Sequence, residues 1–314
     1  NGLEQFKKGV EFANGWQSRF DTIAQNVDDL LSRASELAVQ TSSATTSQAD
    51  RQGAAEEIKQ IRAMALDLAN AKYGNKFLFG GTMTQTEPFI NAEVESWQDD
   101  VDTIAVDAAT AVANLGGAAT AGDRYINTTN GTIYEYDGAA WQADVAAAEG
   151  MSAIVSDQSD ELYVYDGGEW KAQYQGNDSV FSVQIAKNDT VDVNTPGNEV
   201  FTSQQGNILM TLMRLEKAMR DNNISEIRDQ LPELENSSRV LMNTLAKVGA
   251  TMNRLDHTEG IIQRSETANK ESTSNIEDLD YADAITSLQN QQTIYQATLK
   301  SASMITSMSL VDYI

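Results

Sequence analysis

The sequence predicts a mainly α-helical fold with inserted β-structure. Apolar residues recur at coiled-coil spacing near both ends of the chain, so both ends should build one elongated, antiparallel helical bundle. Between the ends the spacing changes to strand-like alternation, which predicts a small β region at one end of the bundle and a sheet-rich insertion domain. Proline is scarce, with three in 314 residues, and this suits long helices.

The first helical pattern begins at Trp16. Steps of four and three alternate for about three heptads, the spacing of a coiled-coil seam. We predict that this seam belongs to the core of a helical rod. Its predicted members are Trp16, Phe20, Ile23, Val27, Leu30 and Leu37. A polar run ends the helix, and Ser47 with Asp50 resembles the capping box that starts a second, antiparallel helix.

Strand patterns follow on both sides of a compositional break. Residues 73–90 and 176–201 alternate and carry turn residues, which predicts short strands or hairpins. Between them, residues 91–175 hold 16 Asp and Glu against two basic residues. The motif that begins at Tyr134 and ends at Trp141 returns 29 residues later. Each copy predicts a hairpin with an Asp-Gly turn, and Tyr and Trp as its core.

Helical spacing resumes at Ile208, and Ile224 and Ile227 begin another short helix. The longest pattern then runs from about residue 233 to 314, with Pro232 near its start and no proline after it. A continuous helix of this length would measure roughly 120 Å and would need partner helices. The part expected to close the rod core carries Leu241, Leu245, Val248, Met252 and Leu255.

The last segment differs because no other helix of the chain is obviously free to cover it. We therefore predict an assembly interface between subunits. It comprises Tyr281, Ile285, Leu288, Tyr295, Leu299, Ile305 and Leu310. The predicted domains are a helical rod from residues 1–90 plus 176–275, an acidic insertion at 91–175 and a C-terminal assembly helix at 276–314.

Composition excludes several classes of function. The absence of cysteine excludes disulfides, thiolate metal sites and cysteine nucleophiles, and the formal net charge of −24 argues against nucleic acid and anionic membranes as partners. His257 is the one histidine, and no spacing of carboxylates assigns an acid and a base, so no enzyme activity and no cofactor are predicted. Acidic runs at residues 99–102 and 157–161 leave a calcium site open as a minor alternative.

Four stretches carry a family resemblance: Leu30–Gln40, Asn75–Thr82 with Pro88 and Phe89, Asp278–Ile285, and the ending Ser309–Ile314. They resemble the flagellin superfamily and, within it, the hook–filament junction proteins. The resemblance covers about residues 16–90 and 176–314, and the acidic insertion lies outside it. In the family an additional N-terminal helix pairs with the C-terminal one, and we expect that helix to be missing from this sequence.

The resemblance implies a non-enzymatic structural adaptor of the bacterial flagellum. It would be exported by the flagellar type III route without a cleaved signal peptide and would assemble outside the cell as a ring between hook and filament. The implied partners are other copies of the chain, hook-associated protein 1, flagellin and an export chaperone. Two alternatives stay open: a flagellin-type filament subunit, or a surface adhesin or carbohydrate-binding module that displays the insertion.

Overall fold

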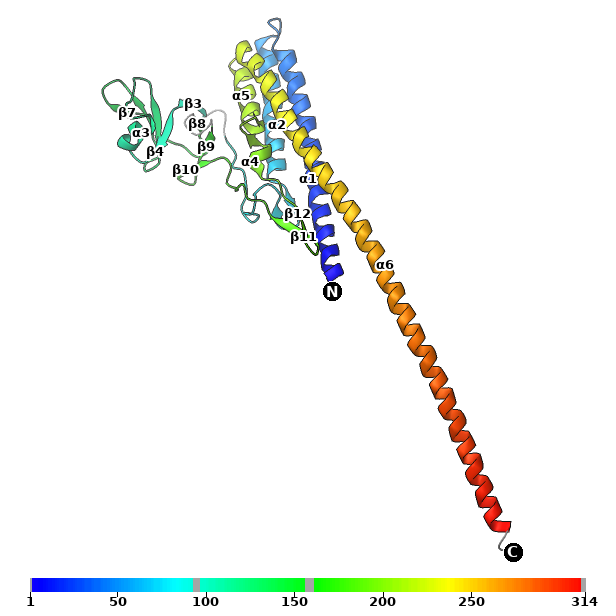
Figure 1. Ribbon diagram of the computed structural model, residues 1–314. Helices are drawn as coiled ribbons and strands as arrows, with labels where there is room; N and C mark the ends of the chain where they lie inside the picture. The colour runs from blue at the N-terminus through cyan, green and yellow to red at the C-terminus, as the bar shows by residue number, and fades with distance from the viewer. Residues whose placement is uncertain (1, 93–96, 156–160, 312–314) are drawn as a thin grey trace. The chain divides into compact units, whose positions relative to one another are not determined.

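The computed structural model describes residues 2–92, 97–155 and 161–311, apart from the side chains of residues 97, 99, 100, 277–280 and 307–311. The chain divides into two compact units, which are described separately here. Residues 8–255 form the bundle unit, and residues 1–7 together with 256–314 form the terminal unit. The predicted fold class, helices at both chain ends with β-structure inserted between them, is confirmed (Figure 1).

Four helices build the bundle unit: α1 (Gly2–Thr41), α2 (Gln48–Ala69), α5 (Ile208–Arg220) and the first part of α6 (Ile224–Val311). α2 and α5 pack along each other. The Arg33–Glu57 ion pair joins α1 to α2, and Ser238 donates a hydrogen bond from α6 to Asp28 of α1. Helices from the two ends of the chain thus share one bundle.

The start of α2 agrees with its predicted cap. The Ser47 hydroxyl accepts a hydrogen bond from the backbone N–H of Asp50 at 3.1 Å, as an N-cap residue does. The Asp50 carboxylate in turn accepts from the Ser47 hydroxyl at 2.7 Å. In a full capping box the acid would accept from the backbone N–H of the cap residue instead. This cap therefore has one of the two hydrogen bonds of a capping box, the one from the Asp50 N–H to the Ser47 hydroxyl.

The buried face of α1 is wider than a single seam. Of the predicted seam, Trp16, Phe20, Ile23, Val27 and Leu37 are buried, whereas Leu30 is half-buried and its neighbour Leu31 is buried. A helix that packs on two sides buries two adjacent rows, and strict alternation of threes and fours finds only one of them. The second row repeats every seven residues: Val10, Gln17, Ala24, Leu31 and Ala38.

The opposing face of α6 is narrower and half polar. It buries one apolar side chain in every seven: Ile227, Leu234, Leu241, Val248, Leu255 and Ile262. The row three residues after each of the first three apolar side chains carries Gln230, Ser237 and Thr244, which are also buried. Leu245 and Met252, which the sequence places in the seam, are half-buried. Polar side chains thus take buried positions beside the apolar row, and the larger apolar side chains of Leu245 and Met252 lie at the edge of the buried face.

Pro232 does not mark a helix boundary. The sequence predicts a separate short helix from Ile224, but α6 runs without a break from Ile224 through Pro232. Proline inside a helix removes one backbone hydrogen bond and costs about 3 kcal/mol. Burial of Ile227 and Leu234 on either side, at roughly 1.5–3 kcal/mol each, offsets that cost.

A small β region packs beside the first half of α1. Its pairs are β1 (Lys72–Tyr73) with β2 (Lys76–Phe77), β11 (Ser182–Ala186) with β12 (Asp189–Asp192), and β13 (Thr202–Ser203) with β14 (Gly206–Asn207). The short helix α4 (Gly197–Val200) lies among them. A chain of ring contacts joins Phe20, Phe79, Phe201 and Phe89. Gly197 must be glycine, because a Cβ there would lie 2.7 Å from the Phe89 ring.

The insertion contains two four-stranded sheets of identical topology. One has the order β4-β5-β6-β7 and the other β3-β8-β9-β10. In each, the first strand is parallel to the second and the rest form an antiparallel meander. The strands are β3 (Trp97–Val101), β4 (Thr103–Ala105), β5 (Arg124–Asn127), β6 (Ile133–Tyr136), β7 (Trp141–Val145), β8 (Ser152–Val155), β9 (Glu161–Asp166) and β10 (Glu169–Ala172). The Ala-rich stretch after β4 holds a short helix, α3 (Ala108–Asn114).

Both predicted hairpins are present, and the equivalent Tyr and Trp residues pair in each. Tyr136 pairs with Trp141 in one copy, and Tyr165 pairs with Trp170 in the other. The two tryptophans nevertheless differ in environment. Trp170 is buried between the two sheets, where its Nε1 donates to the Gly131 carbonyl at 2.9 Å, whereas Trp141 lies half-buried on the outer face beside α3.

The second sheet docks on the bundle. Ile154, Leu162 and Val164 form one buried cluster with Met210 and Met213 of α5. A buried ion pair lies on the same side. Arg62 of α2 contacts the Glu216 carboxylate of α5 at 3.0 Å and donates to the Ala92 carbonyl at 2.7 Å. Arg220, on the next turn of α5, donates to the other oxygen of Glu216. The fully buried Glu216 carboxylate therefore has a charged partner on each oxygen.

The repeat provides a first test. Trp170→Ala opens a cavity between the two sheets and leaves the Gly131 carbonyl unpartnered, so it should lower the free energy of unfolding by about 3–5 kcal/mol. The matched change Trp141→Ala, at the equivalent position of the outer sheet, should cost about half as much or less. Urea unfolding followed by circular dichroism measures both. Equal losses would contradict the assigned stacking of the two sheets.

The Arg62–Glu216 pair provides a second test. Arg62→Ala leaves a buried carboxylate short of one partner and should cost about 3–5 kcal/mol of stability. The control is Arg33→Ala, which removes the exposed Arg33–Glu57 pair and should cost about 0–1 kcal/mol. Both values come from the same urea titration. A loss for Arg62→Ala no greater than for the control would show that the buried pair does not hold α2 against α5.

Candidate assembly surfaces

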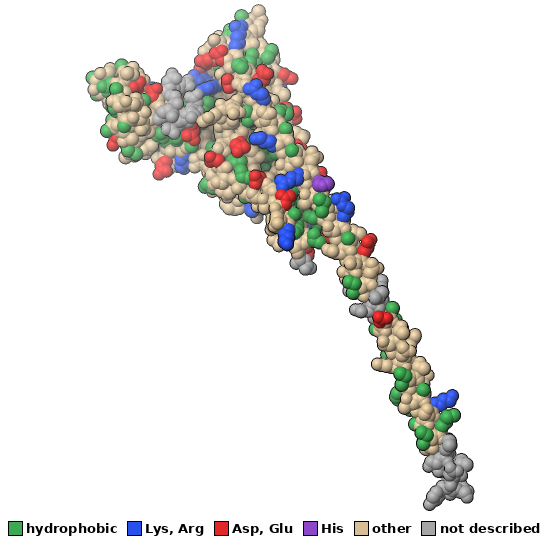
Figure 2. Space-filling model, in the orientation of Figure 1, with side chains coloured by type: hydrophobic (Ala, Val, Ile, Leu, Met, Phe, Trp, Pro, Cys, Tyr) green, Lys and Arg blue, Asp and Glu red, His purple; other side chains and the backbone are tan. Residues whose placement is uncertain are grey.

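The terminal unit carries an exposed apolar stripe on α6. All the predicted interface residues whose side chains are described are exposed on α6, with exposed fractions that range from 42% for Ile285 to 72% for Tyr281. The others are Leu288, Tyr295, Leu299 and Ile305. The side chain of Leu310 lies outside the described residues. Figure 2 shows green apolar side chains along this part of α6 with few charged groups between them.

More apolar side chains of α6 are exposed than the sequence predicted. Ile276, Ile294 and Met304 are also more than 60% exposed. Heptad spacing follows one helical face and misses apolar residues on the others. A hydropathy profile read without regard to period would have found them.

Only the beginning of this unit is covered. Ile262 is buried, and Lys7 of α1 lies 3.7 Å from the Glu266 carboxylate of α6. From residue 267 to 306, every side chain that the structure describes is exposed. An isolated helix is marginal in water, since packing of its apolar face supplies most of its stability. This stretch of α6 therefore has the composition of a helix that pairs with others.

Two arginines join the helix turns at one end of the bundle unit. Arg51 donates to the carbonyls of Thr41 and Ser43, at 2.9 and 2.6 Å, and to the Asn222 side chain at 2.8 Å. Arg228 of α6 donates two hydrogen bonds to the Ser42 carbonyl. Cations at a helix C-terminus satisfy its last carbonyls and oppose its dipole. The α1–α2 turn is thus tied to the α5–α6 turn, which helps to fix the bundle that supports α6.

A groove of 1020 Å³ runs between α1 and α6 near this end. Leu31 and Leu234 lie in it with Val39, whose side chain is 58% exposed. Serines, among them Ser35 and Ser238, line the rest together with a few carboxyl and amide side chains. Small serines allow close approach of another helix. This groove is a second, smaller candidate surface.

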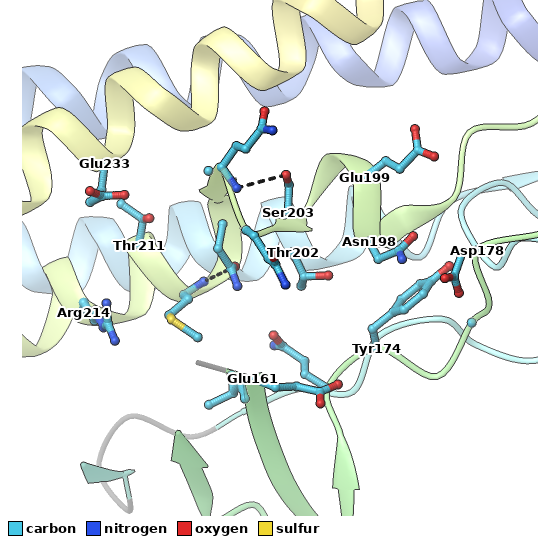
Figure 3. A pocket seen from close by; sticks show the side chains of 18 residues that line it. Glu161, Tyr174, Asp178, Asn198, Glu199, Thr202, Ser203, Thr211, Arg214 and Glu233 are labelled. Carbon is cyan, nitrogen blue, oxygen red and sulfur yellow. Dashed lines mark hydrogen bonds between the residues drawn. The ribbon is translucent and has the colours of Figure 1, made fainter. Parts of the chain in front are cut away.

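A polar cleft of 950 Å³ lies where the insertion meets the β region (Figure 3). Four carboxylates line it, those of Glu161, Asp178, Glu199 and Glu233, against one basic side chain, Arg214. Tyr174 also lines it, and burial raises the pKa of its phenol to about 12. The phenol donates toward the Phe79 carbonyl at 2.9 Å and accepts from the Gly197 N–H. It therefore holds together two loops at the edge of the cleft.

Neither a metal-binding cluster nor a membrane-spanning helix is found among the described residues. Its residues include no cluster of three or more His, Cys, Asp or Glu that could hold a metal. Of the acidic runs singled out in the sequence, residues 157–160 and the side chains of residues 99 and 100 lie outside the description. Among the helices of the described residues, none is long and apolar enough to cross a membrane.

Comparison with known proteins adds a family match for the last segment and a fold for the chain. Residues 233–314 match the bacterial flagellin C-terminal helical region. No curated protein sequence matches the chain. Among solved structures, the chain is similar to a flagellar hook-associated protein from Vibrio parahaemolyticus, with a TM-score of 0.57 and 15% identity over 87% of this chain and 91% of that one.

Two further structures agree. FlgL from Bacillus cereus is 17% identical with a TM-score of 0.53, over 85% of this chain and 92% of that one. Flagellar hook-associated protein 3 from Legionella pneumophila is 11% identical with a TM-score of 0.58, over 89% and 97%. At such identities the likeness shows a shared fold. The chain thus has the fold of these hook-associated proteins, and its last segment matches a flagellin C-terminal helical region.

Proposed function

We propose that the chain is a structural adaptor of the bacterial flagellum that joins hook to filament, in the manner implied by its likeness to hook-associated protein 3. The observation that carries the proposal is the exposed apolar stripe of α6, which lies within the segment that matches flagellins. In an isolated subunit these apolar side chains would stay exposed to water, which is unfavourable. The stripe fits a protein whose last helix is covered by other subunits.

The energetics favour assembly over exposure. Covering one such side chain is worth roughly 1.5–3 kcal/mol, and six predicted interface residues are exposed in each copy. Ordering a helix that is marginal on its own opposes this gain. Helices from several neighbours can cover the stripe together, and repetition around a ring multiplies the gain.

In this proposal the three parts of the chain have separate tasks. Residues 1–90 with 176–275 form the rod, residues 276–314 form the assembly helix, and residues 91–175 project an acidic insertion away from other copies. The insertion carries 14 of the 24 net negative charges, so copies of it repel one another unless solvent and salt separate them. The second sheet of the insertion packs on Met210 and Met213 of α5, and this contact fixes the place on the rod from which the insertion projects.

The proposed partners are other copies of the chain in a ring, hook-associated protein 1 on the hook side and flagellin on the filament side. An export chaperone would cover the apolar helix before export through the flagellar type III channel. The site of action would be the flagellum outside the cell. Neither nucleic acid nor membrane is a proposed partner, because a net charge of −24 disfavours both.

A filament subunit of the flagellin type is the second candidate. The observation in its favour is that the matching family is that of the flagellin C-terminal region. The two candidates differ in how assembly begins. A filament subunit should polymerise by itself, whereas a junction protein should need the end of the hook as a template.

Removal of residues 276–314 tests the proposal. Because these residues contribute little to the core of the bundle unit, the truncated chain should keep a melting temperature close to that of the full chain. It should fail to attach filaments when it replaces the full chain in the bacterium that makes it. Circular dichroism gives the melting temperature, and electron microscopy of negatively stained cells counts attached filaments.

A matched pair of substitutions separates the stripe from the helix itself. Leu288→Asp with Leu299→Asp places charge on the stripe, and Asn290→Asp with Ala297→Asp places it on the opposite face of α6. Only the first pair should abolish attachment. Normal attachment with either the truncated chain or the stripe variant would refute the assembly role.

A further inference from the structure

We propose that the polar cleft receives the β1–β2 hairpin of a second copy, whose exposed Lys72 and Lys76 pair with the carboxylates that line it. The inference rests on the proposed function only in requiring that copies of the chain meet. It identifies a contact between rods, distinct from the stripe on α6. The cleft, the hairpin and all residues named below lie within the bundle unit.

The cleft is built by elements from distant parts of the chain. In Figure 3, Glu199 and Asn198 of α4 and Asp178 lie near Tyr174, and Glu233, Thr211 and Arg214 lie at the other end. Its volume of 950 Å³ lies near the upper limit of ordinary binding pockets, roughly 300–1,000 Å³. This is space for the tip of a hairpin with its side chains.

The cleft has an excess of hydrogen-bond acceptors. Asp178, Glu199 and Glu233 form no ion pair with any residue that the structure describes. An occupant that brings positive charge would pair with these three carboxylates.

The hairpin has the complementary properties. Lys72 and Lys76 are exposed, and neither forms an ion pair with a described residue. Aromatic rings support them instead. The Lys72 ammonium lies 4.2 Å from the centre of the Phe77 ring, and that of Lys76 lies 5.8 Å from the Phe12 ring. The turn between them, Gly74 with a φ of 60° and Asn75, is exposed and compact.

The hairpin cannot reach the cleft of its own chain while it packs on α1. The Tyr73 ring contacts the rings of Phe12 and Trp16, and Gly15 leaves room for its hydroxyl. The cleft is lined by other elements. A second copy is therefore the occupant that the charges favour. With 46 acidic and 22 basic residues, two copies repel each other, and exposed lysines such as Lys72 and Lys76 offset that repulsion where they meet carboxylates.

Disulfide trapping tests the contact, and the natural absence of cysteine makes it clean. Two full-length single variants are mixed at high concentration under mild oxidation. One carries Asn75→Cys at the hairpin tip, and the other carries Ser203→Cys in the cleft. The control replaces Ser203→Cys by Ala139→Cys, an exposed turn of the insertion. The hairpin–cleft pair should cross-link several-fold more than the control pair. Equal yields would overturn the proposal.

Charge reversal completes the test. Lys72→Glu with Lys76→Glu in the Asn75→Cys chain should reduce cross-linking to the control level, as should high salt. Lys187→Glu with Lys59→Glu, which makes the same change in net charge elsewhere, should leave cross-linking within about twofold of the starting yield. Undiminished cross-linking by the hairpin variant would also overturn the proposal.

The two proposals fail in different ways. The cleft contact is refuted, and the role of α6 stands, if two results are found together. Cells with the Lys72→Glu, Lys76→Glu variant attach filaments normally, and the cysteine pair does not cross-link. If the cysteine pair cross-links as expected but chains without residues 276–314 still attach filaments, the adaptor role of α6 is refuted and the cleft contact stands.

Discussion

An apolar helix face must be covered, and the structure depends on how α6 meets this requirement along its length. In the bundle unit, one apolar side chain in seven packs into the core, so α6 is held by helices of its own chain. Beyond residue 267, the described side chains of the same helix have no such cover. One secondary-structure element thus belongs partly to the core of a subunit and partly to its outer surface.

Other features keep the covered part rigid. The arginine contacts at the helix turns and the buried Arg62–Glu216 pair remove freedom between α1, α2 and α5, against which α6 must be ordered. The row of Gln230, Ser237 and Thr244 places polar side chains in the buried face of α6. A buried ion pair and polar seam positions add less stability than an apolar core would, but they restrict the register in which helices pack.

Sequence periodicity predicted the helices, the repeated hairpins and the exposed residues of α6, because each depends on local spacing. Periodicity wrongly placed Leu30 in the buried seam and predicted a helix boundary near Pro232. The burial of Leu30 and the continuity of α6 both depend on what packs against the helix. Nothing in the spacing indicated that Trp170 would be buried and Trp141 half-buried, since identical motifs meet different neighbours. The Arg62 contact with Glu216 and the cleft at Tyr174 join residues far apart in sequence, and no local pattern reports them.

Hydrogen exchange tests most directly whether the last part of α6 needs other subunits. In the full chain as a dilute monomer, amides of residues 281–305 should exchange within the time of helix–coil fluctuations, while those of residues 241–255 should be protected to nearly the full stability of the bundle. On assembly, the first group should become protected. Equal protection of both groups in the monomer would contradict the account, because residues 281–305 would then belong to the subunit's own core.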